Sequence, residues 1–217
     1  MKSDLQLQRD VMDELTWEPS VDAAEIGVSV TDGVVTLNGF AKSYAEKIAA
    51  EKAARHVSGV KAIAEEIKVR LASDLKTADS EIAKRIIDMF NWDVMVPHDK
   101  ISVKVEHGWV TLSGTVDWAY QRNAARNAAS KVTGVTGLSN LIQIRTQPAA
   151  DDVKQRIVSA IKRAADIDAA SVTVTTNNGT VWLDGHVKGW HERDAAERAA
   201  WAAPGVTKVE DNIVVAA

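Results

Sequence analysis

The sequence predicts an α+β protein built from three tandem α-β-β-α-β sandwiches, each with two helices packed on a three-stranded mixed sheet. Three observations predict this: a repeated glycine frame, apolar stripes of helical period, and alternating strands joined by X-Gly turns. Steps of six and then twenty residues separate the glycines of each copy, which are Gly33, Gly39, Gly59, Gly108, Gly114, Gly134, Gly179, Gly185 and Gly205. We therefore expect domains at residues 1–73, 78–146 and 149–217.

Each copy begins with an amphipathic helix, because four apolar residues follow the spacing i, i+4, i+5, i+8, which we expect to lie on one face. They are Leu7, Val11, Met12 and Leu15, then Ile82, Ile86, Ile87 and Phe90, then Val153, Ile157, Val158 and Ile161. Asp79 or Ser80 is the expected cap of the second helix, and Pro148 stands where a helix-opening proline is tolerated. Trp17 and Trp92 follow the helix at equivalent positions, and we assign both to the architecture of the repeat.

A β-hairpin comes next, because alternating apolar residues flank an X-Gly pair at Asp32-Gly33, His107-Gly108 and Asn178-Gly179. The second glycine of the frame ends the hairpin, where we expect a positive φ or a tight exit. Trp109 and Trp182 fall on the outward face of the second strand. Copies of about 65–70 residues are close to the size at which one core is marginal, so we expect contacts between copies to bury these two rings.

An alanine-rich helix and a last strand complete each copy. The buried stripe of this helix is made of small residues, such as Ala49, Ala50, Ala53 and Ala54 in copy one, which allow close packing on a sheet. The third glycine is expected to stop the helix as a left-handed C-terminal cap. The last strand carries Ile67 and Val69 or their counterparts, and the connection through the helix is expected to be right-handed.

The composition is that of an ordinary globular protein, with 46% hydrophobic and 26% charged residues, a net charge of −4 and a pI near 5.8. This balance argues against a dedicated nucleic-acid binder, which is usually basic. The absence of cysteine excludes disulfides, thiolate zinc sites and cysteine nucleophiles. No signal peptide, lipobox or membrane-spanning run is visible, so we expect a cytoplasmic protein, peripheral to the inner membrane if it meets a membrane at all.

No catalytic motif is present, so we expect a protein that is not an enzyme and has no cofactor. The histidines are His56, His98, His107, His186 and His191. They occupy unrelated positions in their copies, and we interpret them as surface or turn residues. Asp32 with Glu25 and Glu18 offers oxygen ligands for a cation, but solvated turn residues are the favoured interpretation. A potassium site made of backbone carbonyls would leave no signature in the side chains.

Aromatic and basic residues gather where the hairpin leads into the second helix, most densely in copy two. The candidate lipid-binding residues are Trp118, Tyr120, Arg122, Arg126 and Lys131 in copy two, with Lys188, Trp190 and Arg193 in copy three. Aromatic rings favour the headgroup boundary, and each basic side chain near anionic lipid contributes roughly 1 kcal/mol. Packing of the two tryptophans against the hairpin, with solvated arginines, is the structural alternative.

The residues Ile101–Val116, the alanine-rich helix, Gly134-Val135 and Asn140–Ile144 together resemble a BON domain, named for bacterial osmotically inducible Y-type and nodulation proteins. The resemblance covers nearly the whole chain, once per copy. Two residues depart from the family pattern, which has asparagine in the last strand: copy two has Asn140 there, but copy one has Glu65 and copy three has Asp211. The resemblance implies an α/β sandwich that is not an enzyme, with relatives associated with phospholipid attachment, osmotic and envelope stress, and potassium binding.

Two functions therefore remain open. The first is peripheral attachment to anionic phospholipid in the bacterial response to osmotic or envelope stress. The second is a cytoplasmic scaffold that binds potassium or a protein partner through its sheet faces. An interaction protein with chaperone-like roles is compatible with the two outward tryptophans but has no motif of its own.

Overall fold

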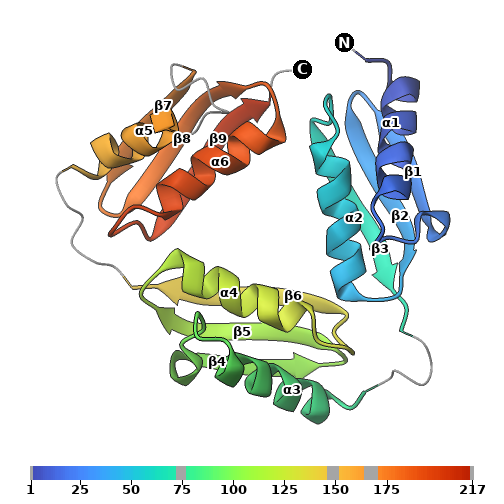
Figure 1. Cartoon of the computed structure of the whole chain (residues 1–217), viewed down its shortest axis with the longest axis horizontal. Coiled ribbons are helices and arrows are strands. Elements are labelled where there is room, and N and C mark those ends of the chain that lie inside the picture. Colours follow the sequence, from blue (N-terminus) through green and yellow to red (C-terminus); the bar gives the residue numbers. More distant parts are fainter. Residues whose placement is uncertain (1, 72–76, 146–151, 164–170, 216–217) are drawn as a thin grey trace. The chain divides into compact units, whose positions relative to one another are not determined.

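The computed structural model describes residues 2–71, 77–145, 152–163 and 171–215, and it contains three units of one design (Figure 1). The first consists of α1 (Asp4–Trp17), η1 (Ala23–Glu25), β1 (Ile26–Thr31), β2 (Val34–Ala41), α2 (Tyr44–His56) and β3 (Ala62–Val69). The second consists of α3 (Asp79–Trp92), η3 (His98–Lys100), β4 (Ile101–Glu106), β5 (Trp109–Val116), α4 (Ala119–Ser130) and β6 (Gly137–Ile144). The third consists of α5 (Val153–Arg163), β7 (Val172–Asn177), β8 (Thr180–Val187), α6 (Trp190–Trp201) and β9 (Lys208–Val215). Pro148 lies outside the described residues.

Each unit holds its own three-stranded sheet, with the strand orders β1-β2-β3, β4-β5-β6 and β7-β8-β9. The hairpin strands β1 and β2 are antiparallel, with Val28 opposite Leu37, whereas β2 and β3 are parallel. The same mixed pairing joins β7, β8 and β9. The predicted α+β class and the three α-β-β-α-β sandwiches are thus confirmed.

The core of each unit lies between its two helices and one face of its sheet. In copy one, Val11 and Leu15 of α1 pack in one cluster with Leu37 and Ile67 of the sheet. The four apolar residues expected on one face of this helix are not equally buried, because Met12 and Ile87 are exposed. A residue five positions along a helix is rotated by about 140° from the first, so it falls at the margin of the stripe.

The hairpin turns have the predicted geometry but an unexpected partner. Asp32 and Gly33 both have positive φ, at 53° and 80°, as a type I′ turn requires. The Asp4 carboxylate accepts hydrogen bonds from both of their backbone N–H groups, at 2.8 and 3.0 Å. In copy two Asp79 does the same with its own turn, while the cap position of α3 is Ala78. The prediction that Asp79 or Ser80 caps this helix was therefore wrong, because the Asp79 carboxylate is used by the hairpin.

The second and third glycines of the frame have distinct roles. Gly39 ends the hairpin with φ of 113°, and a Cβ there would collide with the backbone carbonyl of Glu25, so the expected tight exit is confirmed. The expectation for Gly59 needs correction. Helix α2 ends at His56 with an extended C-cap, and Gly59 occupies a following turn closed by the Val60 N–H and the Val57 carbonyl. The φ of Gly59 is positive, as expected, but the residue adopts it within this turn and not as the C-terminal cap of the helix.

Trp109 lies on the outward side of β5, as predicted, and is half-exposed. Its ring covers Gly137, where any Cβ would collide with it, and its Nε1 donates to Ser139 Oγ at 3.0 Å. Burial of Trp109 and Trp182 between copies stays a prediction.

Candidate functional site

The predicted basic and aromatic residues of copy two lie along α4 but do not form one patch. Tyr120, Arg126 and Lys131 are exposed, whereas Trp118 and Arg122 are half-buried. Tyr120 and Arg126 are separated by about 120° around the helix axis, since each residue turns it by about 100°. The exposed cations of this cluster are therefore Arg126 and Lys131.

In copy three the predicted cluster is tied into the fold. Arg193 donates from Nε to Asp211 Oδ2 at 2.6 Å, and its guanidinium lies 5.1 Å from the centre of the Trp190 ring. The side chains of Arg193 and Asp211 are both mostly buried. An arginine that is already paired and stacked is poorly suited to bind a lipid phosphate. Among the three predicted residues of copy three, Lys188 alone is fully exposed.

The basic and aromatic residues of copy one, Lys42, Tyr44 and Lys47, are also used within the fold. Tyr44 is buried, and Lys47 donates to Glu65 Oε2 at 2.7 Å. Lys42 is paired with Asp22 at 2.6 Å, and this hydrogen bond raises the pKa of the lysine.

The three residues at this position of the last strand, the two departures Glu65 and Asp211 together with Asn140, share one structural role. The side-chain oxygens of Glu65, Asn140 and Asp211 each accept the backbone N–H two residues further on, at 2.7, 3.2 and 3.0 Å. The helix residue that faces this position is basic in every copy. In copies one and three the acid neutralises it, and in copy two Asn140 donates to the backbone carbonyl of Arg122 at 3.2 Å. The position therefore shapes the strand and is not a ligand site.

Two carboxylates near the start of the second helix, one in copy one and one in copy three, are buried. Glu46 and Glu192 are each 8% exposed. Glu46 accepts the backbone N–H groups of Asp22 and Lys42, at 2.8 and 2.7 Å, and Glu192 accepts that of Lys188 at 2.8 Å. These acids fix the chain where the second helix begins, and Gln121 occupies the same place in copy two.

The suggested cation ligands do not assemble. The Glu18 carboxylate accepts from the Ser20 backbone N–H and hydroxyl, which lowers its pKa. Within the described ranges, no three histidine or acidic side chains come together as a metal site.

The most exposed aromatic side chains are the two tryptophans that we assigned to the repeat architecture. Trp17 is 84% and Trp92 is 88% exposed, each as the last residue of its first helix. Packing within its own copy therefore does not account for either ring, and the assignment to repeat architecture stays a prediction. A large apolar surface held in water is a feature of interaction sites.

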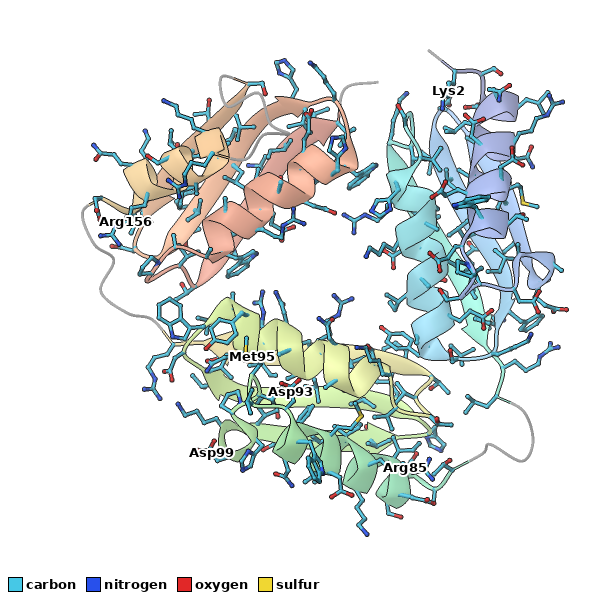
Figure 2. All side chains as sticks on the ribbon, in the orientation of Figure 1. Lys2, Arg85, Asp93, Met95, Asp99 and Arg156 are labelled. Carbon is cyan, nitrogen blue, oxygen red and sulfur yellow. The ribbon has the colours of Figure 1, made fainter. Side chains whose placement is uncertain are left out.

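A hydrogen-bonded turn follows Trp92, and Figure 2 labels two of its residues, Asp93 and Met95. Asp93 Oδ1 accepts the Met95 N–H at 2.9 Å, and the Asp93 carbonyl accepts the N–H of the buried Val96 at 3.0 Å. Between these bonds Val94 is 97% exposed and Met95 is half-exposed. We call Trp92, Asp93, Val94 and Met95 the copy-two tip.

Copy one has the same turn with a different surface. Glu18 replaces Asp93, accepts the Ser20 N–H at 3.1 Å, and accepts the Val21 N–H through its carbonyl at 3.1 Å. Its two turn residues are Pro19 and Ser20, so Trp17 is the one aromatic ring that the copy-one tip exposes. The signal that was missed in the sequence is an apolar Val94-Met95 pair inside a turn, where polar residues are usual.

Taken together, these observations define a tandem-repeat protein whose distinctive surface features are exposed apolar side chains. No helix in the described part of the chain has the length and apolar character to cross a membrane. The family model of the BON domain matches residues 3–70, 78–146 and 149–217, so the chain belongs to the BON family.

Among curated proteins, the osmotically-inducible protein Y of Escherichia coli (strain K12) is 33% identical over 130 residues. The match covers 56% of this chain and 62% of that protein, which is less than two thirds of its length. Two solved structures come from Chlamydia trachomatis, and both are of CdsD, a structural protein of the type III secretion system. The first is 16% identical with a TM-score of 0.27 and covers 97% of this chain and 92% of its own. The second, the C-terminal domain, is 14% identical with a TM-score of 0.27 and covers all of both chains.

Proposed function

We propose that this BON-repeat chain is a non-enzymatic binding protein that attaches peripherally to anionic phospholipid membranes during osmotic or envelope stress. The stress context rests on the family and on the osmotically inducible relative. The observation that carries the lipid assignment is the copy-two tip, where Trp92, Val94 and Met95 are held in solvent by a hydrogen-bonded turn.

The tip suits the boundary between lipid headgroups and acyl chains. Tryptophan is enriched at that boundary, because its ring is apolar and its indole N–H is polar. Burial of a valine or methionine side chain contributes about 1.5–3 kcal/mol. Partial insertion of all three side chains then supplies on the order of 6 kcal/mol, which lies between a millimolar and a micromolar dissociation constant.

Charge supplies the preference for anionic lipid. Arg126 and Lys131 of copy two are exposed cations that belong to the same unit as the tip. Each contributes about 1 kcal/mol near an anionic surface, and this contribution weakens as salt rises. Trp17 provides a second ring in the same chain, and two weak attachments in one molecule strengthen each other through effective concentration.

Co-sedimentation with vesicles tests this function. Phosphatidylglycerol-rich vesicles should pellet the protein more than pure phosphatidylcholine vesicles, and physiological salt should reduce the difference. The double substitution Val94→Pro with Met95→Ser introduces the turn residues of the copy-one tip. The triple variant, which adds Trp92→Ala to this pair, should abolish pelleting. The matched control is Trp109→Ala, which removes a half-exposed ring from a sheet face.

The outcomes separate the function from the site. The triple variant Trp118→Ala, Arg122→Ala and Arg126→Ala tests the alternative site at α4. If this variant loses pelleting and the tip variant does not, the lipid-binding site lies at α4 and not at the tip. No pelleting with either lipid would refute the lipid function. The potassium or protein-partner scaffold would then be tested by a potassium-dependent rise in thermal stability that sodium at equal ionic strength does not reproduce.

A further inference from the structure

We propose that Asn178 is a site of spontaneous chemical modification, at which its side-chain amide is lost through a cyclic imide formed with Gly179. Asparagine followed by glycine is prone to this reaction, because glycine has no side chain to hinder attack by its backbone nitrogen. The chain has two such pairs, Asn38-Gly39 and Asn178-Gly179. The fold, and not the dipeptide alone, therefore decides which of them reacts. This inference does not depend on lipid binding.

The reaction needs only water. The Gly179 backbone nitrogen gives its proton to hydroxide and attacks Asn178 Cγ, which closes an imide ring. The bond between Cγ and Nδ2 breaks, and the leaving nitrogen takes a proton from water and departs as ammonia. A water molecule then opens the ring. Cleavage at Cγ gives aspartate, whereas cleavage at the main-chain carbonyl carbon gives isoaspartate, whose main chain runs through Cβ and Cγ.

The sheet of copy one protects the first pair. Asn38 and Gly39 lie inside the central strand β2, which pairs with β1 on one side and with β3 on the other. The Asn38 side-chain amide lies over Gly27 of β1, where any Cβ would collide with it. The reaction therefore requires this part of the sheet to open, and openings at the centre of a sheet are among the rarest in a folded protein.

The second pair lies in the exposed turn between β7 and β8, where Asn178 has a φ of 46°. In copies one and two a carboxylate holds the equivalent turn, because Asp4 and Asp79 each accept both backbone N–H groups of the turn residues. We call this arrangement the turn clamp. Copy three has Ala150 at the clamp position of the sequence. Among the residues that the structure describes, no side chain accepts the Asn178 or Gly179 N–H in its place.

The turn clamp opposes the reaction in two ways. The carboxylate keeps a negative charge beside the glycine N–H, which disfavours the amide anion that has to attack. Its two charge-assisted hydrogen bonds also hold both turn residues in the left-handed conformation, and the turn has to open before the nitrogen can reach Cγ. The turn of copy three lacks these bonds, so it opens more often than the other two.

The isoaspartate product changes the hairpin of copy three. Its added main-chain carbon lengthens a two-residue loop, and the length of such a loop sets the register of the strands. The Gly179 carbonyl accepts the Thr207 and Lys208 N–H groups at 2.8 and 3.2 Å, so the same turn is tied to the start of β9. Isoaspartate should therefore loosen copy three alone, which hydrogen exchange of the aged chain would report. The aspartate product instead gives the residue that copy one has at Asp32.

Peptide mass spectrometry of the folded chain, aged in mildly alkaline buffer, tests the site. Asn178 should convert about tenfold or more faster than Asn38, because the reaction of Asn38 requires the sheet to open. In concentrated urea the two rates should agree within about threefold, since the same dipeptide is then unfolded at both places. Equal rates in the folded chain, or a difference that persists in urea, would overturn the proposal.

A third Asn-Gly pair tests the turn clamp. Asp32→Asn places this pair in the clamped turn of copy one, where it should convert more slowly than Asn178. Adding Asp4→Ala should raise its rate to about that of Asn178, whereas Asp13→Ala removes an exposed acid from the same helix and should leave the rate unchanged. A rate that Asp4→Ala does not alter would overturn the reason for which Asn178 reacts first.

Discussion

Replacement of the buried Glu46 should destabilise copy one more than any exposed substitution in the same helix. Its carboxylate is 8% exposed and accepts two backbone N–H groups, those of Asp22 and Lys42. Asp22 lies just before η1, which leads into β1, and Lys42 lies between β2 and α2, so one side chain links the segments that lead into β1 and α2. Glu46→Ala leaves both N–H groups without this acceptor.

The expected magnitude follows from the two bonds. A hydrogen bond to a charged group contributes about 1.5–3 kcal/mol, and water partly replaces the lost acceptor at these part-buried positions. We expect Glu46→Ala to lower the free energy of unfolding of copy one by about 2–4 kcal/mol. Glu46→Gln keeps one oxygen acceptor, as Gln121 does in copy two, and should cost about half as much.

Hydrogen exchange read by mass spectrometry reports each copy separately, so it suits a chain of three units. The slowest amides of β2 should exchange roughly thirtyfold faster or more in Glu46→Ala, because about 1.4 kcal/mol corresponds to a factor of ten. Glu51→Ala in the same helix is the control. Unchanged exchange in β2, or equal acceleration in copies one and three, would refute the role assigned to Glu46.

Two further predictions concern the turn clamp and the copy-three ion pair. Hydrogen bonds from the Gly108 and His107 N–H groups lower the pKa of Asp79, so their stabilising effect is present at neutral pH and is lost as the pH falls through this lowered pKa. The amide shifts of these two residues in NMR spectra should titrate with a midpoint below the usual aspartate value of about 3.9, and a midpoint at or above that value would contradict the clamp. Arg193→Ala should destabilise copy three by about 1–2 kcal/mol in hydrogen exchange, because Asp211 loses its partner, yet leave vesicle pelleting unchanged. Reduced pelleting with intact stability would instead return Arg193 to the lipid site.

The fold was predictable because its signals are local. Alternating residues such as Val35 and Leu37 mark strands, and the pair Asp32-Gly33 marks a turn with positive φ at both residues. The errors came from bonds between distant segments. Asp79 has the sequence position of a helix cap, but its carboxylate accepts from a turn that lies 28 residues further on. No local pattern distinguishes these two roles.

The candidate site was less predictable, because residue type does not reveal exposure. Arg193 and Arg126 stand in equivalent helices, yet Asp211 neutralises the first and the second is exposed. Trp92 resembles a packing residue, since Trp17 repeats it, but both rings lie in solvent. The occurrence of tryptophan at the same position in two copies does not say whether the ring packs in the core or faces solvent. The exposed fraction of the side chain, which the sequence does not give, separates these two cases.

Differences between copies on a shared frame indicate where a binding surface is to be sought. The position at the start of the second helix is a buried glutamate in copies one and three, where Glu46 and Glu192 accept backbone N–H groups, and copy two has the uncharged Gln121 there. The tip and the last strand vary in another way, because copy two has Met95 where copy one has Ser20, and Leu141 where copy one has Glu66. Since neither substitution fills a core, stability within the copy does not explain them. If copy two binds through its tip, then a chain whose copy two carries the copy-one residues at the tip should keep its fold and lose vesicle pelleting. Retention of pelleting would show that another surface carries it.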